Sequence, residues 1–235
     1  MTELNTKTRT TAKAYDQGLS DHFRSVYNVM CLGLLLTGLI AYGISSSEAA
    51  INLLFGTPLK WVVMFAPLAF IFFGFTPKAV RTKSAGQLKT LFFLFSALFG
   101  ASLSTVFLVY SGADITRAFF IAAATFAGTS VFGYVTKKDL SGMGGLLIMG
   151  VIGILIAAVV NIFLQSSALD FAISVIGVLV YTGLVAYDTQ NIKETYNASH
   201  GDDANSKMAV MGALSLYINF IMLFQFILNL MGGRD

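Results

Sequence analysis

Two polar residues of this sequence lie in or beside long apolar stretches, where their side chains could bind a cation or exchange a proton. Asp188 directly follows the charge-free run 171–187, and Asn219 lies in the middle of the charge-free run 208–233. An ionisable group deep in an apolar segment is energetically costly and is by default a candidate for function. The alternative roles for Asp188 are structural: solvation near the membrane interface, capping of a helix end, or pairing with Lys193.

Helical periodicity places further polar residues on the same two faces. At about 100° per residue, one face runs from 174 to Asp188, and a second face runs along most of 212–229 and includes Asn219. A helix with such a stripe should face other helices or water, so we expect these side chains to face a pore. Besides Asp188 and Asn219, the polar residues on these faces are Ser174, Tyr181, Ser215, Gln225 and Asn229.

The depths of the two candidate residues are compatible with a contact between them. If the helix that carries Asp188 continues to Tyr196, Asp188 lies roughly 12 Å from that end. Asn219 lies roughly 18 Å from Lys207. Two antiparallel neighbouring helices could therefore bring the carboxylate and the amide together.

The elements that must hold these residues are transmembrane helices. Of the 235 residues, 56% are hydrophobic and only 11% are charged, and the mean hydropathy is +0.74, whereas soluble domains carry roughly 25% charged residues. A helix of about 20 apolar residues crosses the hydrocarbon core, and runs of this length exclude the ~10-residue alternation of a barrel. The charge-free runs are 25–47, 61–77, 90–113, 118–136, 140–169, 171–187 and 208–233.

We therefore predict an all-α membrane protein with seven transmembrane helices. A polar segment, 1–24, precedes a single membrane domain, 25–233, and we expect this segment to be cytoplasmic and partly disordered. The predicted spans are about 25–47, 58–77, 88–111, 115–136, 143–165, 170–196 and 207–231.

The distribution of basic residues predicts the orientation. All fifteen Lys and Arg residues except Lys60, Arg117 and Arg234 fall on the side of the N-terminus, which the positive-inside rule assigns to the cytoplasm. The N-terminus should then lie inside and the C-terminus outside. The net charge of +3 fits contact with anionic lipid headgroups and does not suggest nucleic acid.

The residue inventory argues against an enzyme. His22 and His200 lie in polar connections, so neither a His/Cys metal cluster nor a Ser-His dyad can form at membrane depth. An intramembrane aspartyl protease would need a second acid beside Asp188, and the acids nearest to other spans only bound them. We therefore expect no catalytic residue, no cofactor and no firm metal site. Pro67, in the middle of the second run, should kink its helix and could act as a hinge.

Four segments resemble the bacterial branch of the Bax inhibitor family, also called the transmembrane Bax inhibitor motif family. They are GLVAYDTQNIK (183–193), GALSLYINFIMLFQFIL (212–228), FGYVTKKDLSG (132–142) and VYNVMCLGLLLTGLIAY (26–42). The resemblance implies a seven-helix bundle whose last helix is central and surrounded by the other six. It also implies a pH-sensitive calcium leak in a bacterial inner membrane, in which two aspartates on helices six and seven share a proton and control opening.

The resemblance transfers only half of that aspartate pair. The helix-six aspartate falls on Asp188, in the matching Tyr-Asp context, whereas the helix-seven aspartate falls on Asn219, because Leu-Tyr-Leu-Asp-Phe of the family reads Leu-Tyr-Ile-Asn-Phe at 216–220. An arginine near the end of the second helix holds the pair closed in some members. The stretch GFTPKAV (74–80) gives no equivalent that we can place.

Two functions remain open at this stage. The first is a leak for calcium or protons that passes Asp188, a possible calcium contact, with an altered pH response because two carboxylates no longer titrate in coupled steps. The second is a non-conducting membrane protein that binds a membrane-anchored AAA protease or a stress-response partner, since bacterial members include a protein that restrains such a protease. In that case the polar stripes would only join helices to one another.

Overall fold

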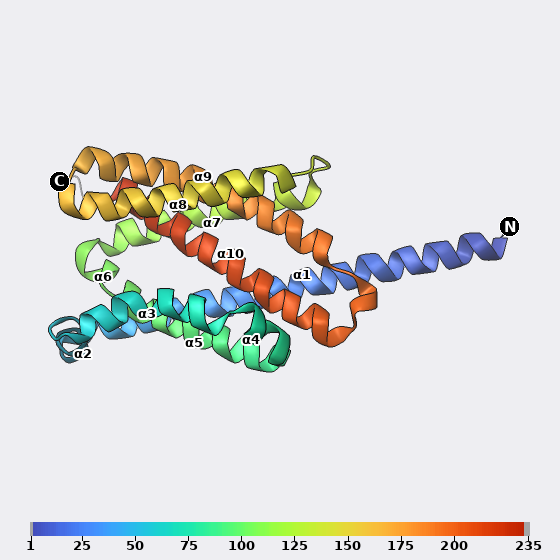
Figure 1. Ribbon diagram of the computed structural model, residues 1–235, viewed down its shortest axis with the longest axis horizontal. Helices are drawn as coiled ribbons and strands as arrows, with labels where there is room; N and C mark the ends of the chain where they lie inside the picture. Colours follow the sequence, from blue (N-terminus) through green and yellow to red (C-terminus); the bar gives the residue numbers. More distant parts are fainter. Residues whose placement is uncertain (1, 233–235) are drawn as a thin grey trace.

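The structure is a computed structural model that describes residues 2–232, with side chains described from Asp16 onward. Within this range the regular elements are all helices, joined by short connections, and there is no strand (Figure 1). The prediction of an all-α protein is therefore confirmed. The helices are α1 (Thr2–Ser45), α2 (Glu48–Phe55), α3 (Leu59–Gly74), α4 (Pro77–Thr82), α5 (Ala85–Leu103), α6 (Val106–Val109), α7 (Gly112–Val135), α8 (Ser141–Leu164), α9 (Ser167–Thr195), the 3₁₀ turn η1 (Ala198–His200) and α10 (Asp202–Met231).

Six segments of the described chain are long and apolar enough to cross a membrane as single helices. They lie in α1, from Asp16 onward, in α5 continued by α6, and in α7, α8, α9 and α10. The predicted second span, 58–77, corresponds to α3, which α2 precedes at an angle of 78°. Counting this bent pair as one span gives the seventh crossing. The 16 residues of α3 measure only roughly 24 Å, less than the ~30 Å hydrocarbon core.

The last helix is the central one. Within its apolar segment 67% of residues are buried, against 11% to 33% in the other five single spans. Its main neighbours are α9, α1, α7 and α5, while α3 packs chiefly on α5 and α8 chiefly on α9. Figure 1 shows α10 running obliquely through the bundle between these helices. The prediction of a central last helix is therefore confirmed, and four of the surrounding helices supply most of its contacts.

Helix ends are set by capping side chains more than by the limits of the charge-free runs. The hydroxyl of Ser111 accepts from the N–H of Asp114, and that of Ser166 accepts from the N–H of Leu169. These bonds satisfy N–H groups that have no partner within the helix. As a result α7 and α9 each begin three residues earlier than the predicted spans at 115 and 170.

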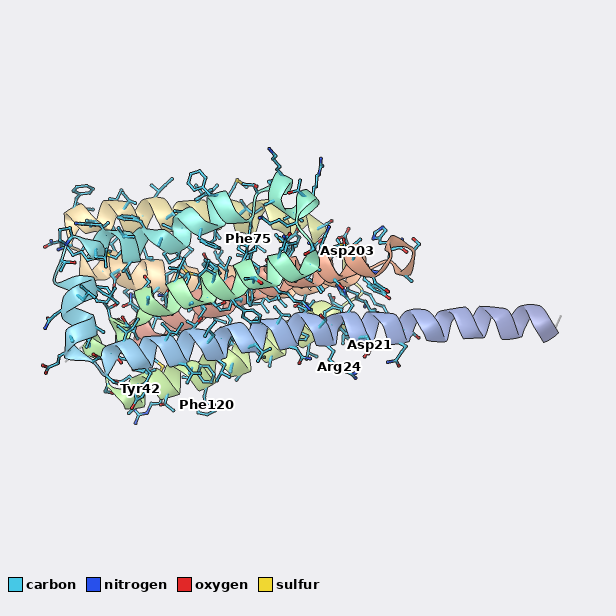
Figure 2. The ribbon with its side chains drawn as sticks, turned by 90° about the horizontal axis from the view of Figure 1, so that it is seen from below. Asp21, Arg24, Tyr42, Phe75, Phe120 and Asp203 are labelled. Atoms are coloured by element: carbon cyan, nitrogen blue, oxygen red, sulfur yellow. The ribbon has the colours of Figure 1, made fainter. Side chains whose placement is uncertain are left out.

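The N-terminal polar segment is helical in the structure from Thr2 onward. From Thr2 the helix α1 continues without a break to Ser45, 44 residues in all, or roughly 66 Å. Because this is about twice the hydrocarbon thickness, α1 extends well past the other helices toward the N-terminus (Figures 1 and 2). The start of α1 and the end of α10 lie at opposite ends of the bundle, as an odd number of crossings requires.

Pro67 lies inside α3, and the helix continues through it. It is the buried residue of α3 and belongs to the side that packs on α5. The break in this region comes later, where α3 ends at Gly74 and α4 starts with Thr76 as N-cap and Pro77 in its first turn. Proline suits a first turn because its missing N–H would have no helical partner there. A hinge function for Pro67 stays a prediction.

A glycine permits close contact between α7 and α9, the helix that carries Asp188. A Cβ on Gly133 of α7 would lie 2.3 Å from the carbonyl oxygen of Ala186 on α9. Only a residue without a side chain allows this approach of two backbones, which is the usual mode of close packing in membranes. It fixes α9, and with it Asp188, against α7.

Candidate functional site

Asp188 and Asn219 are in contact across the α9–α10 interface. The amide nitrogen Nδ2 of Asn219 donates to Oδ2 of Asp188 at 2.7 Å, and the hydroxyl of Ser215 donates to the same oxygen. Ser215 and Asn219 are four residues apart, so both side chains leave the same side of α10. The two polar faces deduced from the sequence therefore meet at this carboxylate.

The carboxylate borders a cavity of about 220 Å³ that extends toward the α9–α10 connection. Asp188, Asn191 and Thr195 line it from α9, and Met208 and Ser215 are among the lining residues of α10. Asp188 is half-buried and Asn219 is buried. The carboxylate thus lies where a cavity from one end of the bundle stops, with Asn219 on its closed side.

No cation of the described protein pairs with Asp188. Lys193, one helical turn further along α9, donates instead to the carbonyl oxygen of Tyr134 at the end of α7, at 2.7 Å, and its ammonium lies 4.9 Å from the centre of the Tyr134 ring. The alternative in which Lys193 neutralises Asp188 is therefore excluded in this conformation. The carboxylate instead accepts hydrogen bonds from two neutral donors, the hydroxyl of Ser215 and the amide of Asn219.

Aromatic packing fills the α9–α10 interface beyond Asn219. The Tyr181 and Phe226 rings have centroids 5.7 Å apart, and a Cβ on Gly177 would lie 2.5 Å from the Phe226 ring. Tyr181 is seven residues, or roughly 10 Å, along α9 from Asp188. Tyr181 thus packs against Phe226 over Gly177, an arrangement that we call the aromatic plug, and its pore-facing role stays a prediction.

A second polar cluster lies past this plug, at the far end of α9 and α10. The amide of Asn229 donates to the carboxylate of Asp170 and to the hydroxyl of Ser174, both at 3.2 Å. Its Oδ1 accepts from the hydroxyl of Tyr110 at 2.8 Å. Ser174 and Asn229 therefore lie together but far from Asp188, since Asn229 is ten residues, or roughly 15 Å, along α10 from Asn219.

Gln225 is half-buried on α10, six residues beyond Asn219. Six residues correspond to roughly 9 Å along the helix, so Gln225 lies between the Asp188 site and the Asn229 cluster. Its pore-facing role stays a prediction. Tyr217 points away from the polar stripe, toward α1 and α5, where its hydroxyl lies 2.6 Å from that of Thr37 and its ring packs against Phe92 and Phe95.

A chain of hydroxyls beside the site was not predicted from the sequence. The hydroxyl of Tyr27 on α1 lies 2.5 Å from that of Ser130 on α7, which lies 3.0 Å from that of Thr189 on α9. Thr189 also donates to the carbonyl oxygen of Val185 at 2.7 Å. The chain ends at that backbone carbonyl rather than at Asp188. It therefore joins three helices around α10 and does not lead to the carboxylate.

Gln190 was also missed, and it fixes the α7–α8 connection to α9. Its Oε1 accepts from the N–H of Leu140 at 2.7 Å, and its Nε2 donates to the carbonyl oxygen of Lys138 at 2.9 Å. Within the same connection, hydrogen bonds from Ser141 hold the pKa of the Asp139 carboxyl below its usual value. The sequence signal that could have identified Gln190 is its position in YDTQNIK, two residues after Asp188.

The described residues offer no cluster of three or more His, Cys, Asp or Glu side chains that could hold a metal ion. Calcium takes six to eight oxygen ligands. Asp188 would supply one carboxylate to such a set.

The comparison with known proteins decides the family. A family model described as "Inhibitor of apoptosis-promoting Bax1" matches residues 19–235. The chain belongs to the Bax inhibitor family. The resemblance that the four sequence segments indicated is therefore confirmed over nearly the whole chain.

Bacterial relatives of this family align along almost their full length. An uncharacterized protein of Caulobacter vibrioides is 48% identical over 230 residues, which cover 93% of this chain and 91% of the relative. An uncharacterized protein of Rickettsia prowazekii is 42% identical, with 97% and 98% covered. The inner membrane protein YbhL of Escherichia coli is 40% identical, with 92% and 93% covered. The protein is thus an integral membrane protein of the Bax inhibitor family.

Proposed function

We propose that this protein is a cation leak of a bacterial inner membrane that passes calcium along the α9–α10 interface. The observation that supports the proposal is the position of the Asp188 carboxylate, which borders a cavity at one end of the bundle. Its partners in the described chain are the neutral donors Ser215 and Asn219, and it has no basic partner there. A carboxylate in such a position attracts a hard cation at modest cost, because part of its surroundings is already polar. From the distribution of basic residues we further propose that this cavity faces the cytoplasm.

On this proposal, the conformation described here is the closed one. From the cavity toward the other end, a cation would meet Asp188, then the plug of Tyr181 and Phe226 over Gly177, and then Asp170 in the far polar cluster. The two carboxylates at the ends of this path could each replace part of the hydration shell. The aromatic plug between them could not, so conduction requires α9 and α10 to separate there.

Asn219 should make the closed state less sensitive to pH. In a pair of aspartates, the hydrogen bond between the two helices exists only while one carboxyl keeps its proton. The amide of Asn219 donates to Asp188 at 2.7 Å, and it should remain a donor across this range because an amide does not titrate in the physiological range. Asn219 therefore imitates the protonated partner, and we expect a weak leak with a flat pH response.

Calcium efflux from liposomes tests this proposal. Wild type and Asn219→Asp are reconstituted at equal density, loaded with calcium, and followed with an external indicator from pH 6 to 8. The introduced carboxylate should make efflux rise with pH, because loss of the shared proton replaces a hydrogen bond by repulsion. Asp188→Asn should lower the flux at every pH.

The matched control is Asn52→Asp, which makes the same change on the exposed side of α2, away from the α9–α10 interface. Its efflux should equal that of wild type at all pH values. If Asn219→Asp and Asn52→Asp give the same flux and the same pH dependence, the argument from the carboxylate pair is wrong.

A non-conducting interaction protein is the second candidate. It is favoured by the way the interior polar groups are satisfied among themselves, as in the Tyr27–Ser130–Thr189 chain and the Thr37–Tyr217 pair. On that proposal a membrane-anchored protease would be recovered with the protein from bacterial membranes, and the liposomes would stay silent for wild type and for Asn219→Asp.

A further inference from the structure

Two cavities lie one after the other along α1 and α7, and the second is also lined by α5, α6 and α10. One measures about 580 Å³ and is lined from Ser20 to Cys31 on α1 and from Phe126 to Tyr134 on α7. The other measures about 230 Å³ and reaches Ala41 on α1. Together they follow α1 from Ser20 to Ala41, roughly 31 Å, which is close to the thickness of the hydrocarbon core.

The second cavity, which we call the α1–α7 pocket, connects the outer surface with the central helix. Gly38 of α1 and Thr116 and Phe119 of α7 line it and are exposed on the surface of the bundle. Phe220, Ile221 and Phe224 line it from α10 and are buried, with exposed fractions of 5%, 4% and 9%. Tyr42 of α1 and Phe120 of α7, labelled in Figure 2, mark this end of the bundle.

The chemistry of the α1–α7 pocket selects its occupant. Apart from Thr37, whose hydroxyl is already bonded to Tyr217, and Thr116, whose hydroxyl donates to the carbonyl oxygen of Gly112, the lining is apolar. Water gains little there, because a water molecule needs two to four polar partners. The surface around the pocket faces hydrocarbon, and a flexible apolar chain that enters from it gains dispersion contacts with the lining.

We infer that the α1–α7 pocket binds one acyl chain of a membrane phospholipid, whose methylene groups reach the side of α10 formed by Phe220, Ile221 and Phe224. The argument is the continuity of the pocket with the lipid-facing surface and its depth in the leaflet. A single acyl chain covers about half of the ~30 Å core. The pocket occupies the half of α1 toward Ala41, so its ligand belongs to the leaflet at the α2 and α6 end.

Photocrosslinking tests the inference. The full chain is reconstituted into phosphatidylethanolamine and phosphatidylglycerol vesicles that contain a phospholipid with a diazirine midway along one acyl chain. After irradiation the protein is digested and the adducts are mapped by mass spectrometry. We expect adducts within 220–224 of α10, although this segment is buried, as well as on the lipid-facing side of α8, which serves as the internal positive control.

Filling the mouth of the pocket should abolish the α10 adduct. Gly38→Phe adds a ring at a lining position where a Cβ would meet nothing within 4 Å, and Gly43→Phe makes the same change on the same helix outside the pocket. Gly38→Phe should lose the adduct on 220–224 and keep that on α8, whereas Gly43→Phe should keep both.

Thr116→Phe fills the mouth from the α7 side and decides the matter if Gly38→Phe does not fold. Size-exclusion profiles and helical circular dichroism show which variants retain the bundle. Two results would overturn the inference: labelled α8 with no adduct on 220–224 in wild type, or an α10 adduct that persists in a folded mouth-filling variant. Neither result bears on calcium efflux past Asp188.

Discussion

Phe226→Ala should open the aromatic plug between the two polar clusters of the α9–α10 interface. The Phe226 ring packs against Tyr181, with centroids 5.7 Å apart, and occupies the space above Gly177, where a Cβ would lie 2.5 Å from the ring. Removing a buried phenyl ring costs about 3 kcal/mol at the low end of the usual range, and the low end applies because Phe226 is only half-buried.

This magnitude predicts a large change in leak. If the packing exists only in the closed conformation, the closed state loses about 3 kcal/mol relative to the open one, and each 1.4 kcal/mol changes an equilibrium tenfold. The open fraction should then rise by up to about 100-fold. The bundle should still fold, since whole-protein stabilities are about 5–15 kcal/mol.

Calcium efflux from liposomes measures this prediction, and Phe220→Ala is the matched control. Phe220 is removed from the same helix, but its ring faces α7, where it packs against Phe119 and Phe126 with centroids 5.7 and 5.6 Å away. Phe220→Ala should lower stability without raising efflux. Equal efflux from the two variants at equal protein density would refute the assignment of the plug.

Substitutions at three further positions, Gly133, Gln190 and Tyr217, test how the bundle holds the site. Gly133→Ala should lower the free energy of unfolding by about 1–3 kcal/mol, because the new Cβ would lie 2.3 Å from the Ala186 carbonyl oxygen. Gly128→Ala on the same helix is the control, since its Cβ would meet nothing within 4 Å. Equal unfolding midpoints in SDS for the two variants would contradict the close contact. Gln190→Leu removes both hydrogen bonds to the backbone of the α7–α8 connection, so amide hydrogen exchange in that connection should become faster. Unchanged exchange would mean that other contacts hold the connection in place. Tyr217→Phe should lower the free energy of unfolding by about 0.6 kcal/mol, the usual value of an interhelical hydrogen bond. Tyr217→Ala should lower it by about 3–5 kcal/mol, because the buried ring is lost as well. Similar losses for the two variants would mean that the hydroxyl, not the ring, holds α10.

Periodicity predicted the contact between Asp188 and Asn219 because both residues interrupt apolar runs and lie on definable helix faces. The same reasoning placed Ser174 and Asn229 with them, although a stripe that runs along a whole helix meets several different neighbours. A stripe therefore identifies a side of the helix and does not identify a single site. Tyr181 shows this most clearly, because its ring packs on Phe226 between the two polar clusters.

The hydroxyl chain could not be predicted because isolated Ser and Thr residues are common in transmembrane helices and usually bond to their own backbone. Thr189 does so, and only the packing of α7 against α9 brings Ser130 to it across 59 residues of sequence. The bend before α3 was missed for a different reason. Residues 48–60 contain a single acid and a single base, so charge patterning gave no sign that α2 forms a separate helix at 78° to α3.

Asn219 preserves the geometry expected of an aspartate pair but removes one of its two titrating groups. Ser215 and Asn219 direct two donors at one oxygen of Asp188, so the arrangement that a shared proton would maintain in an aspartate pair is maintained here by groups that do not titrate. A cavity still reaches the carboxylate, and the hydrogen bonds still join α9 to α10. What the amide removes is the repulsion that would push the helices apart when the last proton leaves. On the proposed function, opening would therefore depend on something other than that proton, and the plug at Phe226 is where such an influence would act.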